Sequence, residues 1–108
     1  MRKIEREMLT AVANGRDWRS ANTSVDNTDH GIVVRLHGNK IAQLDGDKMY
    51  ITPAGWLTPT TKSRLNALLS QFTYCARIHA KNFEWFLSTS DNIDQEMFSD
   101  SVATVSIK

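Results

Sequence analysis

The middle of the chain alternates apolar and polar side chains, and two short turn signals interrupt this alternation. Ile32, Val34 and Leu36 are separated by single residues, and Gly38-Asn39 and Asp45-Gly46 have the composition of tight hairpin turns. A side-chain period of two is typical of a strand with one buried face. The pattern predicts an antiparallel meander of three or four strands, over 20–25, 32–37, 40–44 and 48–52, with a turn at 26–31.

An amphipathic helix is predicted before the meander, over residues 1–14. Asn14-Gly15 should end this helix, because both residues tolerate the left-handed backbone conformation. Charged side chains, Glu5 among them, are expected to cover its solvent-facing surface. Its apolar side chains form one stripe at helical spacing: Ile4, Met8, Leu9 and Val12.

A second helix is predicted after the meander. Thr58 is the expected N-cap, since its hydroxyl can accept a backbone N–H bond, and Pro59 suits the first helical position. Thr60 is the alternative cap. The expected buried stripe of this helix comprises Leu65, Leu68, Leu69 and Phe72.

Alternation returns in the last third of the chain. Residues 74–81 predict a strand, and Lys81-Asn82 is the expected turn into a partner strand over 83–87. Phe83 and Trp85 would share the core-facing side of that partner strand. Residues 88–101 are polar and predict a loop or one short helical turn, and 102–107 predict a last strand.

The order of these elements predicts an α+β fold: an N-terminal helix, an antiparallel β-meander, a central helix and then further antiparallel strands. We expect a single layer of sheet packed against the two helices. A length of 108 residues with 41% hydrophobic residues suits a single domain over 1–108 with one core.

Composition excludes several classes of protein. The single cysteine, Cys75, cannot form an internal disulfide or a Cys-rich zinc site, and it is expected to be a small buried residue. No segment approaches 18 consecutive apolar residues, and the first residues are charged where a signal peptide needs an apolar stretch. We therefore expect a soluble cytoplasmic protein with no membrane partner.

The histidines and acids carry no recognisable catalytic pattern. His30, His37 and His79 lack the spacing of metal ligands, and neither a nucleophile elbow nor paired carboxylates on one element occur. We expect no enzymatic activity, no cofactor and no metal.

The start of the second predicted helix concentrates polar side chains: Thr58, Thr60, Thr61, Lys62 and Arg64. Free N–H groups and the helix dipole favour an anion at such a start. Each cation there costs about 0.3–1 kcal/mol, which a bound phosphate or an acidic partner would offset. In the alternative interpretation, the hydroxyls cap the helix while Lys62 and Arg64 face solvent or pair with acids elsewhere.

The polar faces of two predicted strands carry basic side chains. If these strands are neighbours, their basic residues line one surface suited to a nucleic-acid backbone. An ordinary solvated sheet face has the same pattern and is the alternative. The residues concerned are Arg35, His37, Arg77, His79 and Lys81.

Aromatic side chains add two further hypotheses. Trp56, Tyr50 and Trp85 are available to stack on bases. Phe86 falls on the polar face beside Glu84, where it would form a partner surface or a dimer interface if exposed. Its alternative is burial under the C-terminal loop.

Charge is polarised along the chain although the net charge is only +1. Residues 1–83 carry twelve Lys and Arg against seven Asp and Glu, a balance of +5, and residues 84–108 carry one against five, a balance of −4. We expect the acidic segment either to cover the basic face or to repel one end of a polyanion.

Several segments together resemble a family of small bacteriophage proteins of about a hundred residues and unknown function. The resemblance covers residues 1–100 and rests on RDWRSANTSV, VRLHGNKIA, GWLTPTTKSRLNALL and FEWFL with its acidic tail. The GW-x-T-x-TT-K-x-R-LNALL block is its most specific part. The resemblance implies a phage or prophage product in the host bacterial cytoplasm, and it implies no catalytic residue or cofactor.

Three functional hypotheses follow. The first is a non-enzymatic binding protein that engages nucleic acid, or a host nucleic-acid-handling or defence factor, as an inhibitor or in host takeover. The second is an anti-defence protein that sequesters a nucleotide or another small phosphorylated ligand. The third is a structural protein that forms homo-oligomers.

Overall fold

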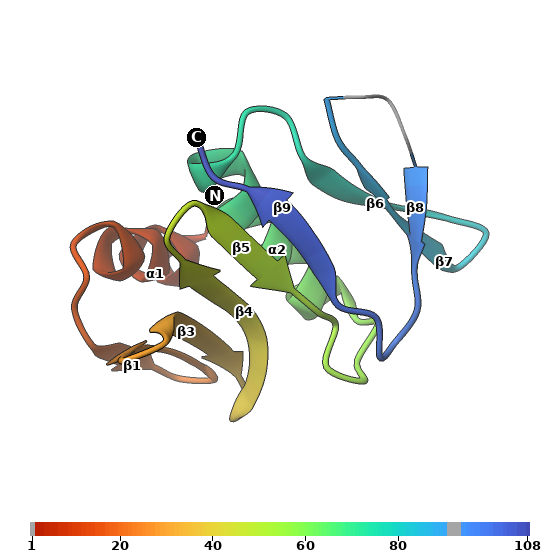
Figure 1. The fold of residues 1–108 in the computed structure, drawn as a ribbon. Coiled ribbons are helices and arrows are strands. Elements are labelled where there is room, and N and C mark those ends of the chain that lie inside the picture. Colours follow the sequence, from red (N-terminus) through yellow and green to blue (C-terminus); the bar gives the residue numbers. More distant parts are fainter. Residues whose placement is uncertain (1, 91–93) are drawn as a thin grey trace.

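The computed structural model describes residues 2–90 and 94–108, and Figure 1 shows their arrangement. Helices and strands follow one another as the sequence predicts: a helix, a meander, a second helix and further strands. The α+β class is therefore confirmed. The elements are α1 (Lys3–Ala13), β1 (Trp18–Ser20), β2 (Thr23–Thr28), β3 (Gly31–Leu36), β4 (Asn39–Asp45), β5 (Lys48–Ile51), α2 (Pro59–Phe72), β6 (Arg77–Lys81), β7 (Glu84–Ser88), β8 (Asp94–Met97) and β9 (Ala103–Ser106).

The larger sheet contains six strands in the order β1-β2-β3-β4-β5-β9, and all its neighbours are antiparallel. Strand β9 joins the meander at its edge, although it is the last strand in the chain. Alternation holds as predicted in β5, where Met49 and Ile51 are buried and Tyr50 is exposed. One buried row crosses five strands and lies in the core: Val25, Val34, Ala42, Ile51 and Ala103.

The remaining strands form a separate antiparallel sheet, in the order β6-β7-β8. The predicted single sheet layer is wrong in this respect. Helix α2 contacts both β4 and β6, and its Leu65, Leu68 and Leu69 are fully buried. A helix that is apolar over so wide a surface needs cover on more than one side, and the second sheet provides it (Figure 1).

Asn66 holds the edge of the smaller sheet against α2. Its side-chain amide donates to the Ile78 carbonyl at 2.8 Å and its Oδ1 accepts from the Ile78 N–H at 2.7 Å. At Ile78, the free edge of β6 is thereby satisfied by a side chain, as a neighbouring strand would otherwise satisfy it.

The helix ends follow the predicted signals. At the end of α1, the Arg16 N–H bonds the Ala11 carbonyl and the Gly15 N–H bonds the Val12 carbonyl, a Schellman motif with Gly15 at φ +61°. At the start of α2, the Thr58 hydroxyl accepts from the Thr61 N–H at 3.2 Å. Thr58 and not Thr60 is the N-cap.

The first strand of the meander differs from the prediction. Residues 20–25 do not form one strand, because Ala21 takes a left-handed conformation and the chain turns there between β1 and β2. The turn predicted over 26–31 is shorter, since β2 extends to Thr28, which pairs with Gly31. A glycine is needed at position 31 because β4 passes close by: a Cβ there would collide with the Leu44 carbonyl oxygen.

Two predictions in the C-terminal third are also wrong. The β6–β7 turn is Asn82-Phe83, and Phe83 is fully exposed there instead of lying in the core. Within the predicted loop 88–101, β8 pairs with β7 and buries Met97 against the core. A strand with one apolar residue has no alternation signal, so tertiary packing decides it. Ile93 lies outside the described residues.

Cys75 is exposed, contrary to its expected burial. It lies between α2 and β6, where the chain turns before regular pairing begins and the neighbouring Thr73 and Ala76 take the buried positions. Of the helices in the described part of the chain, none is both long and apolar enough to cross a membrane.

Candidate ligand-binding site

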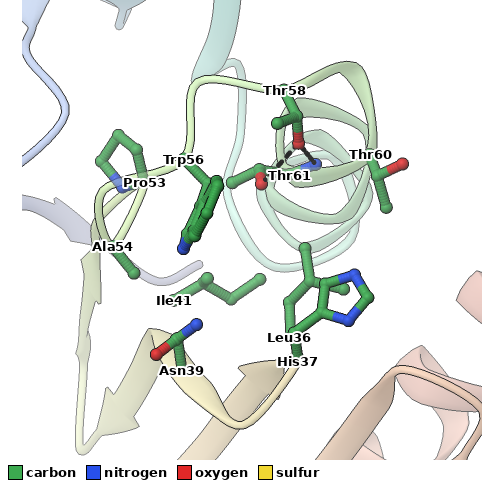
Figure 2. A pocket seen from close by; sticks show the side chains of 10 residues that line it. All are labelled: Leu36, His37, Asn39, Ile41, Pro53, Ala54, Trp56, Thr58, Thr60 and Thr61. Atoms are coloured by element: carbon green, nitrogen blue, oxygen red, sulfur yellow. Dashed lines mark hydrogen bonds between the residues drawn. The ribbon is translucent and has the colours of Figure 1, made fainter.

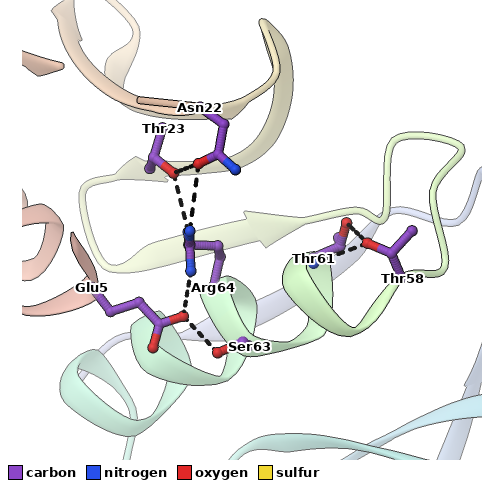
Figure 3. A network of polar contacts seen from close by, with 7 residues as sticks. All are labelled: Glu5, Asn22, Thr23, Thr58, Thr61, Ser63 and Arg64. Carbon is purple, nitrogen blue, oxygen red and sulfur yellow. Dashed lines mark hydrogen bonds and ion pairs between the residues drawn. The ribbon is translucent and has the colours of Figure 1, made fainter. Parts of the chain in front are cut away.

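The predicted anion cluster at the start of α2 is divided by the fold. Arg64 is only 3% exposed, and its Nη1 lies 2.8 Å from Glu5 Oε2. Its Nε donates to the Thr23 hydroxyl at 3.0 Å, and its Nη2 lies 3.4 Å from Asn22 Oδ1 (Figure 3). Arg64 therefore pairs with an acid elsewhere in the fold, as the alternative interpretation proposed, and it joins α1, α2 and the β1–β2 turn.

Glu5 is the acid that sequence reasoning placed wrongly on the solvent side of α1. It is 4% exposed, and it also accepts a hydrogen bond from the Ser63 hydroxyl. A buried carboxylate requires a partner of this kind. No local signal marks Glu5, because its partner is 59 residues away in the chain.

The helix start offers few donors to an anion. Pro59 has no N–H, the Thr61 N–H is bonded by Thr58, and the Lys62 N–H is bonded by the Thr58 carbonyl. Among the described residues, the Thr60 N–H is the one in this turn without an internal partner. Lys62 is half-buried. The first turn of α2 is thus a well-capped helix end.

A cleft of about 520 Å³ opens between the start of α2 and the β3–β4 turn (Figure 2). Its apolar surface comes from Leu36, Ile41, Pro53 and Ala54. Trp56 forms one wall with its indole, which is 61% exposed. The polar residues around it are His37, Asn39, Thr58, Thr60 and Thr61.

The loop that carries Trp56 is held at several points. The Trp56 N–H bonds the Pro53 carbonyl at 3.0 Å, and the Gly55 N–H bonds the Ser99 carbonyl at 2.7 Å. The Thr52 hydroxyl accepts from the Ala54 N–H at 3.2 Å. Both Ala54 and Gly55 have positive φ. These bonds fix the backbone from which the Trp56 side chain extends beside the cleft.

A β-bulge supplies the floor of the cleft. The register between β3 and β4 shifts where Val34 pairs with Ala42 and Arg35 pairs with Lys40, which leaves Ile41 as an extra residue. Ile41 is buried and lines the cleft. Bulges commonly redirect a side chain in this way. The adjacent apolar residues Ile41 and Ala42, which break the alternation, are the sequence signal that could have indicated it.

The predicted common basic face does not form, because β3 and β6 belong to different sheets. His37 lies in the β3–β4 turn with φ +52°, and its N–H bonds the Asn22 carbonyl at 2.7 Å. It contributes to the cleft and not to a strand face. Arg35 lies on β3 as predicted, and its Nε is 3.5 Å from Asp26 Oδ2.

Two of the three basic residues of β6 lie near acids of the C-terminal segment. Lys81 is the cross-strand partner of Glu84, and His79 Nε2 lies 3.9 Å from Asp94 Oδ2. Arg77 lies across from Ser88, which in turn pairs with Asp94. Acids of the C-terminal segment thus lie near part of β6, while Arg77 and Lys81 themselves remain exposed.

Of the three aromatic residues predicted to stack on bases, only Trp56 lines the cleft. Trp85 is buried in the core, and Tyr50 lies on the outer face of the larger sheet. Phe86 is half-buried, with its ring stacked on His79 at 5.7 Å between centroids. Within residues 2–90 and 94–108, no three His, Cys, Asp or Glu side chains lie together as a metal site would require.

The family comparison provides the setting for this site. The Kyanoviridae Gp96 protein family matches residues 1–104, almost the whole chain. The chain belongs to this family. The family of small phage proteins implied by the resemblance is thereby confirmed. No curated protein and no solved structure matches it.

Proposed function

We propose that this phage protein is a non-enzymatic binding protein of the host cytoplasm that sequesters a small ligand with a planar, hydrogen-bonding ring, of the nucleobase class. The observation that carries the proposal is the exposed indole of Trp56 held beside an apolar cleft. A volume of about 520 Å³ lies within the range of small-molecule sites.

The chemistry of the cleft suits such a ring. Leu36 and Ile41 offer apolar contact, and Trp56 offers a π-face for stacking. Asn39 and His37 carry hydrogen-bonding groups of both kinds, and Thr60 adds a hydroxyl. A few polar groups around an apolar floor are the usual means by which a site orients a small molecule.

The test is a titration of the full chain with the four ribonucleosides, followed in ¹H–¹⁵N NMR spectra by the indole N–H signal of Trp56 and by the backbone amide signals of His37 and Asn39, which the Trp56→Ala variant retains. We expect one nucleoside to shift this signal. Trp56→Ala should weaken binding by about 5- to 150-fold, because stacking of a base on an aromatic side chain contributes about 1–3 kcal/mol.

Tyr74→Ala is the matched control, since Tyr74 is equally an exposed aromatic residue and does not line the cleft. It should bind as the unaltered chain does. If no nucleoside shifts the Trp56 signal, or if both variants lose binding equally, the proposal is wrong.

Nucleic acid, or a host factor that handles it, is the second candidate partner. It is supported by a cross-strand row on the larger sheet that holds Arg19, Arg35 and Lys40. Binding of a single-stranded oligonucleotide that weakens steeply with salt would favour this candidate. Homo-oligomer formation is the third hypothesis, and Phe86 supports it less now that His79 covers its ring.

A further inference from the structure

A second hollow, of about 260 Å³, adjoins the Trp56 cleft and shares His37 with it. It lies between the β1–β2 turn, at Ala21 and Asn22, and the β3–β4 turn. The bond from the His37 N–H to the Asn22 carbonyl ties these two turns together. Its strand residues are Arg19, Thr23, Ser24 and Arg35.

Three cations stand in one cross-strand row, and two of them, Arg19 and Arg35, line this hollow. Arg19 pairs with Ser24, Ser24 with Arg35, and Arg35 with Lys40. Like charges directly opposite each other destabilise a sheet. Asp26 Oδ2 lies 3.5 Å from Arg35 Nε, but both side chains are 41% exposed. An ion pair so exposed contributes little to the stability of the fold. The row retains a positive balance of two.

Two neutral donors complete the hollow. Ser24 is 8% exposed and lines it, and within the described chain its hydroxyl makes no hydrogen bond. Asn22 Oδ1 is held by Arg64 and by the Thr23 hydroxyl at 2.8 Å, so its amide nitrogen points away from that cluster (Figure 3). The buried Arg64 thus positions a donor at the hollow.

We propose that this hollow binds the phosphate of a mononucleotide whose base occupies the Trp56 cleft. Guanidinium groups bind phosphate oxygens in a bidentate manner, and Arg19 and Arg35 flank the Ser24 hydroxyl on both sides. The phosphate site is therefore assigned to the outer face of the larger sheet, at strands β1 to β3, and not to the start of α2. The base part of this assignment rests on the proposed function.

A free mononucleotide is favoured over a nucleic-acid strand by the size of the positive surface. The row is three cations long with Asp26 beside it, and the basic residues of β6 belong to the other sheet and do not extend it. Such a row can neutralise one phosphate, whereas a strand of nucleic acid requires several contacts along its backbone.

The experiment compares each ribonucleoside with its 5′-monophosphate by NMR titration of the full chain. We expect the monophosphate to bind at least about tenfold more tightly, as hydrogen bonds to a charged group allow. The double variant Arg19→Gln/Arg35→Gln should remove this difference while nucleoside binding remains. Arg6→Gln/Arg16→Gln, which changes the charge equally at exposed positions outside the hollow, should keep it.

Equal affinity for nucleoside and monophosphate would overturn the phosphate site and leave the proposed function standing. A second outcome is that no nucleoside binds, while inorganic pyrophosphate shifts the Ser24 amide signal of the unaltered chain but not of the Arg19→Gln/Arg35→Gln variant. This outcome would overturn the proposed function and support the phosphate site. A dephosphorylated single-stranded oligonucleotide that binds more tightly than every monophosphate would overturn the assignment to a mononucleotide.

Discussion

The buried Glu5–Arg64 cluster and the open Trp56 cleft both involve the first turns of α2, yet they use polar side chains in opposite ways. In the cluster, the donors of Arg64 find acceptors inside the protein. Around the cleft, Thr60 and the indole of Trp56 remain accessible. The difference teaches that polar residues adjacent in sequence contribute to stability where the fold satisfies them, and are available to a ligand where it does not.

Breaking the buried cluster should have the largest effect. Arg64→Ala leaves the Glu5 carboxylate buried without its charged partner, which should lower the free energy of unfolding by about 3–5 kcal/mol. Urea denaturation followed by circular dichroism measures this loss.

Lys62→Ala, two residues away, is the control and should change stability by less than about 0.5 kcal/mol. Replacing both charges, as Glu5→Leu/Arg64→Met, should recover much of the loss because no buried charge is then left unpaired. A loss below about 1 kcal/mol for Arg64→Ala would mean that solvent reaches the cluster.

Asn66 provides the second polar link of α2 and the next largest effect. Asn66→Ala removes both hydrogen bonds to Ile78 and leaves a backbone N–H and a carbonyl at the β6 edge unsatisfied. We expect a loss of about 1–3 kcal/mol. Amide hydrogen exchange should accelerate in β6 first, and the exchange of β3 and β4 serves as the internal reference.

Phe83 represents the opposite case, an exposed residue that costs stability. Asn82 and Phe83 form a two-residue turn with φ of 54° and 67°, where glycine is preferred at the second position. Phe83→Gly should therefore raise the free energy of unfolding by about 1 kcal/mol. Phe98→Gly is the comparison, because Phe98 is also exposed but lacks a positive φ, and it should bring no gain.

Removal of the Trp56 side chain should hardly affect stability, in contrast to Arg64. Trp56→Ala deletes an exposed ring, and the hydrogen bond from the Trp56 backbone N–H to the Pro53 carbonyl does not depend on the side chain. We expect a change below about 0.5 kcal/mol in urea denaturation. A larger loss would place the indole among the structural residues and weaken its proposed role in ligand binding.

Asp17 is an exposed polar link and provides the smallest effect. Hydrogen bonds from the Asn27 backbone N–H and then from its side chain hold the pKa of Asp17 below its ordinary value of 3.8. A lowered folded-state pKa stabilises the protein above the unfolded pKa, and this contribution is lost as the pH falls through the folded value. The stability advantage of the unaltered chain over Asp17→Asn should hence be present at neutral pH and be lost as the pH falls through the folded-state pKa of Asp17. An advantage that persists in acid would exclude the charge as its cause.

Local signals were sufficient for much of the fold. The start of α2 at Thr58-Pro59 and the end of α1 at Asn14-Gly15 could be predicted from a few neighbouring residues. This is possible because caps satisfy backbone groups within one helical turn. The alternation in β3 to β5 is equally local. Trp56 was recognised as a candidate for stacking, but its cleft depends on the Ile41 bulge, which forms only when β3 and β4 pair.

Residue chemistry and spacing therefore established the α+β class, both helices, the central meander and an unusual polar helix start. Only the tertiary structure decided that the strands divide into two sheets around α2, that Arg64 pairs with Glu5, and that Asp94 lies near His79 of β6. The physical reason is distance along the chain. Helix caps and strand periods act over a few residues, whereas a buried charge finds its partner only after elements far apart in sequence have packed.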